Sequence, residues 1–252
     1  KRALGSSVII AITTTAIALP WLARNAAVYG PDDPLGLVRH SAVVVGQLRT
    51  TELIRQIGWP AYFARYALTT FQSFWGQFGW MAAPLPARAY AALMLVMWLG
   101  SAGLLAALGG LRHADEPTRR GVYVLVLWSG FTAASYLWYN TQFVQFQGRY
   151  LFPALTPLMV GLTYGLSTLP LRRGWAIGAV SGAVVALVAV GLVRGDLPGM
   201  ALALCVIAAI ALLALSYLPE RWRWLAPYGV ALGLAALSAW SLWNIVIPAL
   251  AP

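Results

Sequence analysis

Two arginine-centred pairs interrupt an otherwise apolar sequence: Arg24 with Asn25, and Arg149 with Tyr150. A guanidinium group presents a planar fork of N–H donors that pairs with phosphate through two hydrogen bonds. Both pairs are therefore candidates for binding an anionic ligand. The alternative is that each arginine anchors a helix end by reaching to lipid headgroups, with nearby aromatic rings forming an interfacial belt.

Two adjacent carboxylates follow the first pair, in the turn Pro31-Asp32-Asp33-Pro34. Asp32 and Asp33 are weak candidates for a catalytic base, or for oxygen ligands of a divalent cation. The alternative is a solvated turn in which the aspartate side chains accept hydrogen bonds from nearby backbone N–H groups, and prolines on both sides favour it. The sequence assigns no catalytic residue beyond these.

Other familiar catalytic and metal-binding patterns are absent from the sequence. It contains neither a phosphate-binding G-x-x-x-x-G-K-[ST] loop nor an H-E-x-x-H zinc motif. The single cysteine, Cys205, lies inside an apolar run, so no disulfide or cysteine-based metal site is available within the chain. We expect no cofactor, and a divalent cation has no clear set of ligands.

The composition is that of a polytopic membrane protein. Of the 252 residues, 60% are hydrophobic and only 10% are charged, whereas soluble domains carry about 25% charged residues. The net charge of +10 comes from arginines scattered between apolar segments, a pattern that sets membrane topology and does not predict nucleic-acid binding. The chain opens on Lys1 without a methionine, so we expect a C-terminal fragment of a longer protein that forms one membrane domain over residues 1–252.

Seven apolar stretches approach the roughly 20 residues that a helix needs to cross a bilayer. Backbone groups in lipid must find their hydrogen bonds within the segment, so these stretches should be helices and the fold all-α. The predicted spans are Leu4–Ala23, Tyr90–Leu111, Gly121–Tyr139, Leu151–Leu169, Trp175–Val193, Gly199–Leu218 and Leu225–Leu250.

The short connections alternate between arginine-rich and arginine-poor. The N-terminus and the connections that follow the second, fourth and sixth spans hold nine basic residues, while the turns opposite hold only Arg149 and Arg194. Basic residues concentrate on the cytoplasmic side. We therefore predict a multi-pass protein of the bacterial inner (plasma) membrane, with its N-terminus cytoplasmic and its C-terminus extracytoplasmic.

This topology favours a ligand for Arg149. The positive-inside rule should deplete arginine from a short outer turn, so its presence there calls for a reason. Gly148 before it allows a close backbone approach. Pro157, one turn inside the predicted fourth span, should kink that helix near the outer face.

The only long connection, residues 24–88, is predicted to be an extracytoplasmic loop inserted between the first two spans. Within it we expect a short amphipathic helix over Ser41–Ile57. Phe63, Ala67, Phe71, Phe74 and Phe78 recur at spacings of three or four, which predicts a second helix over Pro60–Phe78 that lies in the headgroup plane. A full membrane span is the alternative, although it would upset the alternation of charge.

Small residues four apart in three spans predict close helix packing. They are Gly161 with Gly165, Gly178 with Gly182, and Gly229 with Gly233.

Three motifs carry a family resemblance: LPWLARNAAVYGPDDPLGL, FQSFWGQFGWMAAPLP and QFQGRYLFPALTPL. In this order, separated by hydrophobic spans, they resemble the C-terminal half of bacterial polytopic membrane glycosyltransferases of the GT-C class. The chain is similar in particular to the protein O-mannosyltransferase and aminoarabinose transferase group. The resemblance covers Leu19–Gly165 and fades in the last three spans.

The resemblance implies sugar transfer from a polyprenyl-phosphate-linked donor to an acceptor on the extracytoplasmic face. It assigns donor-phosphate binding and shaping of the cavity to Arg149 and Tyr150 and to Arg24 and Asn25. The family's catalytic acidic residue belongs to an early outer loop, which lies outside this chain. The implied partners are the lipid-linked donor, membrane lipids and the missing N-terminal half of the same polypeptide.

Two other functions are compatible with the same sequence. One is a non-enzymatic membrane protein, such as an exporter or flippase subunit or a structural partner in a membrane complex. The other is a polymerase or ligase of lipid-linked glycans.

Overall fold

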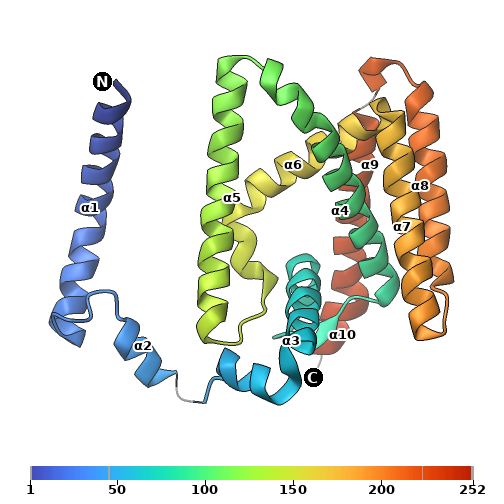
Figure 1. Cartoon of the computed structure of the whole chain (residues 1–252). Helices are drawn as coiled ribbons and strands as arrows, with labels where there is room; N and C mark the ends of the chain where they lie inside the picture. The colour runs from blue at the N-terminus through green and yellow to red at the C-terminus, as the bar shows by residue number, and fades with distance from the viewer. Residues whose placement is uncertain (1, 45, 223, 251–252) are drawn as a thin grey trace.

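The computed structural model describes residues 2–44, 46–222 and 224–250, and these are almost entirely helical (Figure 1). Seven segments of the described chain are long and apolar enough to cross a membrane. The helices that form them are α1 (Arg2–Tyr29), α4 (Ala87–Leu108), α5 (Glu116–Gln142), α6 (Leu155–Thr168), α7 (Arg173–Arg194), α8 (Gly199–Tyr217) and α9 (Leu225–Ser241). The prediction of an all-α polytopic membrane protein is confirmed.

Shorter elements complete the chain. The 3₁₀ helices are η1 (Gly109–His113), η2 (Gly148–Ala154), η3 (Leu169–Leu171) and η4 (Glu220–Trp222). A π-helical turn, η5 (Leu242–Val246), and the short α10 (Ile247–Leu250) follow α9.

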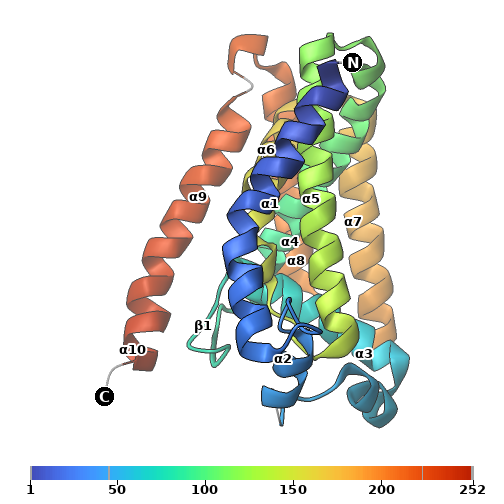
Figure 2. The ribbon, with the colours of Figure 1, turned by 90° about the vertical axis from the view of Figure 1, so that its left-hand side faces the viewer.

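The connections gather at two ends of the helical array, and both views agree on them (Figures 1 and 2). One end holds the start of α1 together with η1, η3 and η4, and we call it the η1 end. The other end holds α2 (Leu37–Val43), α3 (Thr50–Trp75) and a β-hairpin, and we call it the hairpin end. The assignment of these ends to the two sides of a membrane stays a prediction.

The long connection differs from its predicted form. The expected helix over Ser41–Ile57 is wrong, because α2 ends at Val43 and α3 begins only at Thr50. The expected helix over Pro60–Phe78 begins as predicted, because the backbone is non-helical at Gly58, whose φ is 77°, and the part of α3 after this kink contains Pro60. At its other end α3 stops at Trp75, and Gln77–Phe78 (β1) pairs with Ala83–Pro84 (β2) as an antiparallel hairpin. Gly58 can take the left-handed conformation without a steric penalty, which is how the kink forms.

Helix α3 lies at the hairpin end, and its parts before and after the kink point in different directions (Figures 1 and 2). The interfacial interpretation concerns the second part, which holds Pro60. The fourth predicted span is also less regular than expected: the chain begins it as η2, and Pro157 lies in the first turn of α6. A proline there removes no helical hydrogen bond. The irregularity near the outer face is therefore the 3₁₀ segment, and a kink at Pro157 is not present.

The tightest packing joins α4 to α6. Gly100 and Gly103 of α4 lie against Gly165 of α6 so closely that a Cβ atom at any of the three would overlap the facing chain. Leu99 and Leu169 are buried beside this crossing. The packing role predicted for Gly165 is confirmed, whereas a Cβ atom at Gly229 or Gly233 would meet nothing within 4 Å.

The first helix stands apart from the rest (Figure 1). None of the apolar window of α1 is buried inside the described structure. Ile9 and Ile17 are 66% and 75% exposed. This apolar surface must meet lipid or another membrane helix.

Candidate functional site

The turn that carries Arg149 is fixed by a close contact between two backbones. Gly148 begins η2, and its N–H donates a 2.7 Å hydrogen bond to Ser73 Oγ on α3. Ser73 Oγ donates in turn to the Thr69 carbonyl oxygen, at 2.6 Å. A Cβ atom on Gly148 would overlap Thr70 and Phe74 of α3. The predicted close approach at Gly148 is thus confirmed, and its partner is α3.

Asn140, at the end of α5, stabilises the same turn through hydrogen bonds. The sequence analysis did not identify this residue. Its side chain is 97% buried, as its 3% exposure shows. Asn140 Oδ1 accepts a hydrogen bond from the Gln145 N–H at 3.0 Å, and Nδ2 donates to the Tyr136 carbonyl at 2.9 Å. Its own carbonyl accepts a hydrogen bond from Thr50 Oγ1 at 2.8 Å. An asparagine just after an apolar run was the available signal, because a buried amide needs such partners.

Arg149 projects from η2 between two aromatic rings. Its guanidinium carbon lies 5.2 Å from the centroid of the Trp80 ring and 5.6 Å from that of Tyr150. These are cation–π distances. Among the described residues no carboxylate pairs with Arg149. The guanidinium is therefore oriented by aromatic contacts, and its N–H donors stay available to a ligand.

The hairpin presents Trp80 to Arg149 at a conformational cost. Trp80 and Met81 have φ angles of 54° and 74°, in the left-handed region, which costs a residue with a Cβ atom about 1–2 kcal/mol. Trp80 nevertheless stays 84% exposed. Burial of its ring therefore does not compensate for this cost. Strained residues of this kind are more frequent at functional sites.

A cavity of about 530 Å³ opens beside the turn, between α5 and η2. Three of its lining residues are tyrosines: Tyr136, Tyr139 and Tyr150. The Tyr136 and Thr70 hydroxyls share a 2.7 Å hydrogen bond, which fixes the position of that ring. Behind it, burial raises the pKa of Tyr66 on α3, which stacks on Tyr136 at 5.7 Å, so Tyr66 stays neutral at physiological pH. Rings with polar edges suit an amphipathic ligand.

The remaining predicted site residues lie elsewhere. Arg24 and Asn25 lie inside the last turns of α1, which continues to Tyr29 past the predicted end of the span at Ala23, and Asn25 is buried while Arg24 is exposed. In Figure 1 α5 stands between α1 and η2. The described structure therefore does not bring the two arginine-centred pairs together.

The two aspartates have different environments. Asp33 is 7% exposed, and its Oδ2 accepts a 2.8 Å hydrogen bond from the Arg39 N–H in α2. This bond is the main reason that the pKa of Asp33 is lowered, with help from the N–H groups of Val38 and Leu37. Asp33 thus takes the structural role that was the alternative to catalysis, while Asp32 is exposed.

The described residues hold no group of three or more histidine, cysteine, aspartate or glutamate side chains placed to bind a metal ion. The candidate site is therefore the Arg149–Trp80–Tyr150 group together with the tyrosine-lined cavity. Comparisons with models of protein families, with curated proteins and with solved structures find no match to this chain.

Proposed function

We propose that this chain is the C-terminal membrane part of a glycosyltransferase that takes its sugar from a polyprenyl-phosphate-linked donor on the extracytoplasmic face. The observation that carries the proposal is the unpaired Arg149 guanidinium, held by Trp80 and Tyr150 at the end of a spanning segment. A lipid phosphate lies at that depth when its hydrocarbon tail is in the membrane. The sequence resemblance supports the same assignment.

Each part of the site has a role in this proposal. Arg149 binds the donor phosphate through its N–H fork. Tyr136, Tyr139 and Tyr150 offer rings and hydroxyl groups to the sugar within the adjoining cavity. Gly148 and Asn140 act through the backbone, because they fix the turn from which Arg149 and Tyr150 project.

The proposed reaction forms a bond between the acceptor's nucleophilic atom and the anomeric carbon of the sugar. The bond from that carbon to the phosphate oxygen breaks, and the acceptor's proton goes to a base. The lipid phosphate leaves with an additional negative charge, which Arg149 stabilises. Asp33 is unsuited to be the base because its carboxylate already accepts a hydrogen bond from the Arg39 N–H in the first turn of α2. In the family that the sequence resembles, the base is an acidic residue of an early outer loop.

Substitution of Arg149 in the full-length protein tests the proposal. Binding of polyprenyl phosphate should weaken about 10- to 100-fold in Arg149→Ala, since hydrogen bonds to a charged group contribute roughly 1.5–3 kcal/mol. Arg149→Lys should recover part of this loss, because lysine keeps the charge but not the fork. The measurement is lipid binding in nanodiscs, with polyprenol as the ligand that lacks phosphate, followed by a sugar-transfer assay.

Arg65→Ala is the matched control, because Arg65 is an exposed arginine on α3. It should bind polyprenyl phosphate like the unmodified protein. If Arg149→Ala and Arg149→Lys also bind donor and transfer sugar normally, Arg149 is a headgroup anchor and the proposed site is wrong.

The non-enzymatic alternative has one observation in its favour, the exposed apolar surface of α1. A structural partner in a membrane complex would use such a helix to pack against other subunits. In that case, disrupting α1 contacts with Ile9→Trp and Ile17→Trp should dissociate a complex. The same changes should leave polyprenyl phosphate binding intact.

A further inference from the structure

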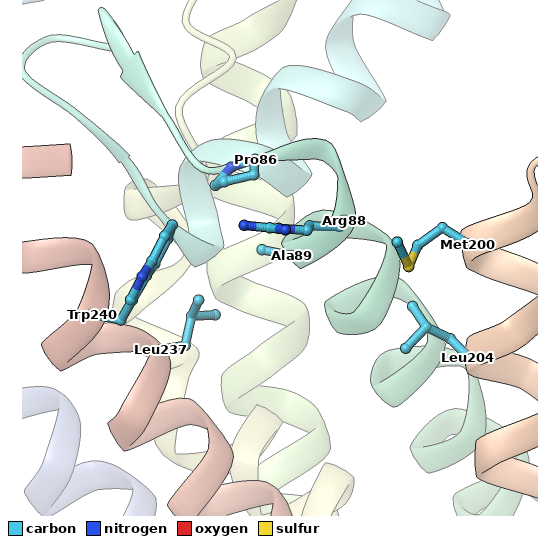
Figure 3. Close-up of a pocket in the computed structure, with 7 residues that line it drawn as sticks. All are labelled: Pro86, Arg88, Ala89, Met200, Leu204, Leu237 and Trp240. Carbon is cyan, nitrogen blue, oxygen red and sulfur yellow. The ribbon is translucent and has the colours of Figure 1, made fainter. Parts of the chain in front are cut away.

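A second crevice lies at the hairpin end, and it shares no lining residue with the tyrosine-lined cavity. Helices α8 and α9 are joined at the η1 end and diverge toward the hairpin end, and the first turn of α4 forms the floor between them (Figures 2 and 3). The crevice has a volume of about 310 Å³. It is distinct from the site proposed above.

The crevice is apolar except for one charge. Leu204 and Met200 line it from α8, and Leu237 and Trp240 line it from α9. Figure 3 shows the Arg88 side chain extended across the floor, with its guanidinium directed toward the α9 wall. In the described part of the chain Arg88 has neither a hydrogen bond nor an ion pair. Arg88 is itself exposed, so its guanidinium can reach an anionic headgroup at the mouth of the crevice without breaking a protein contact.

The depth of Arg88 narrows the identity of that partner. It is the second residue of α4 and so lies at the end of a segment long enough to cross a membrane, where lipid headgroups are found. The apolar walls continue from the headgroup level of Arg88 along α8 and α9, in the direction in which an acyl chain extends into the bilayer. A soluble anion would gain nothing from these walls.

We propose that the crevice between α8 and α9 binds an anionic phospholipid. Its phosphate pairs with the Arg88 guanidinium, and one acyl chain lies against Leu204, Leu237 and Trp240. The absence of a protein carboxylate at Arg88 makes the site prefer a lipid with net negative charge over a zwitterionic one, whose own cation competes for the phosphate.

The test is native mass spectrometry of the full-length protein released from nanodiscs that contain equal amounts of phosphatidylglycerol and phosphatidylcholine. The unmodified protein should retain phosphatidylglycerol in preference, and Arg88→Gln should reduce that preference about tenfold. Arg88→Lys should keep most of it, because the charge remains. Leu204→Trp, which fills the crevice and leaves Arg88 in place, should also release the lipid.

Arg65→Gln is the matched control, since it removes an exposed arginine from α3 at the same end of the molecule. It should leave lipid retention unchanged. Equal losses in Arg65→Gln and Arg88→Gln would mean general attraction to headgroups and would overturn the site. Displacement of the lipid by millimolar inorganic phosphate would identify a site for free phosphate and would also overturn the proposal. Circular dichroism of each variant verifies that it is folded.

Discussion

Gly148 is the residue on which the position of Arg149 depends most directly. Its lack of a side chain lets η2 approach the backbone of α3, where its N–H reaches Ser73. Gly148→Ala would force a Cβ atom into Thr70 and Phe74, and overpacking of this kind costs about 1–3 kcal/mol. We expect a lower melting temperature in detergent and weaker polyprenyl phosphate binding together.

Gly178→Ala provides the comparison, because a Cβ atom at Gly178 in α7 would meet nothing within 4 Å. Alanine also favours a helix by about 0.5–1 kcal/mol relative to glycine, so this variant should be no less stable than the unmodified protein. If Gly148→Ala behaves in the same way, η2 is not held by its contact with α3.

The sequence identified Gly148 and Arg149 but not what they contact. The role of Gly148 could be predicted because glycine before a lone arginine is a local signal. Trp80 lies 69 positions before Arg149 in the chain. A β-hairpin that no strand pattern predicted brings its ring next to the Arg149 guanidinium. A two-residue strand is too short to show alternation.

At the scale of single elements, α2 depends on the carboxylate that precedes it. The backbone N–H of Arg39 lowers the pKa of Asp33, so the ionised form stabilises the start of α2. That stabilisation is complete above the ordinary pKa of about 4 and is lost as pH falls through the lower pKa of the folded state. NMR of the detergent-solubilised protein should show the Asp33 carboxyl carbon and the Arg39 amide titrating together, with a midpoint below about pH 4.

Asp33→Asn keeps an acceptor but removes the charge, so the Arg39 amide should lose this pH dependence. Asp32→Asn is the control, since Asp32 is exposed and its neighbour Asp33 retains the bond to Arg39. If Asp32→Asn abolished the titration of the Arg39 amide, the wrong carboxylate would have been assigned to α2.

The elements of the long connection were predicted less well than the spans. Aromatic spacing indicated a helix around residues 60–75, and α3 is there. The prediction placed residues 50–57 in a separate helix over Ser41–Ile57, because Gly58 and Pro60 indicate a break. Both residues are accommodated by one kink. The packing of Leu53, Tyr62 and Phe146 around this region explains why the helix continues on both sides.

At the scale of the whole molecule, the arginines of the short connections predict the orientation in the membrane. Ala82→Cys in the exposed hairpin and Gly110→Cys in η1 mark the two ends, in a Cys205→Ser background that removes the buried native thiol. The positive-inside rule predicts that a membrane-impermeant maleimide labels the first in intact cells and the second only after permeabilisation. The reverse pattern would place the Arg149 site in the cytoplasm.

The sequence by itself determined the membrane class, the seven spanning segments and the alternation of arginine-rich and arginine-poor short connections. These properties are local: whether a segment enters lipid depends on its own length and apolar content. Only the tertiary structure decided which segments of the chain contact one another. It placed α3 and Trp80 against the turn of Arg149, left Arg24 and Asn25 on a separate helix, and gave Gly165 but not Gly229 a facing helix. In lipid the hydrophobic effect does not select helix partners, so pairing depends on shape and hydrogen bonds between distant segments.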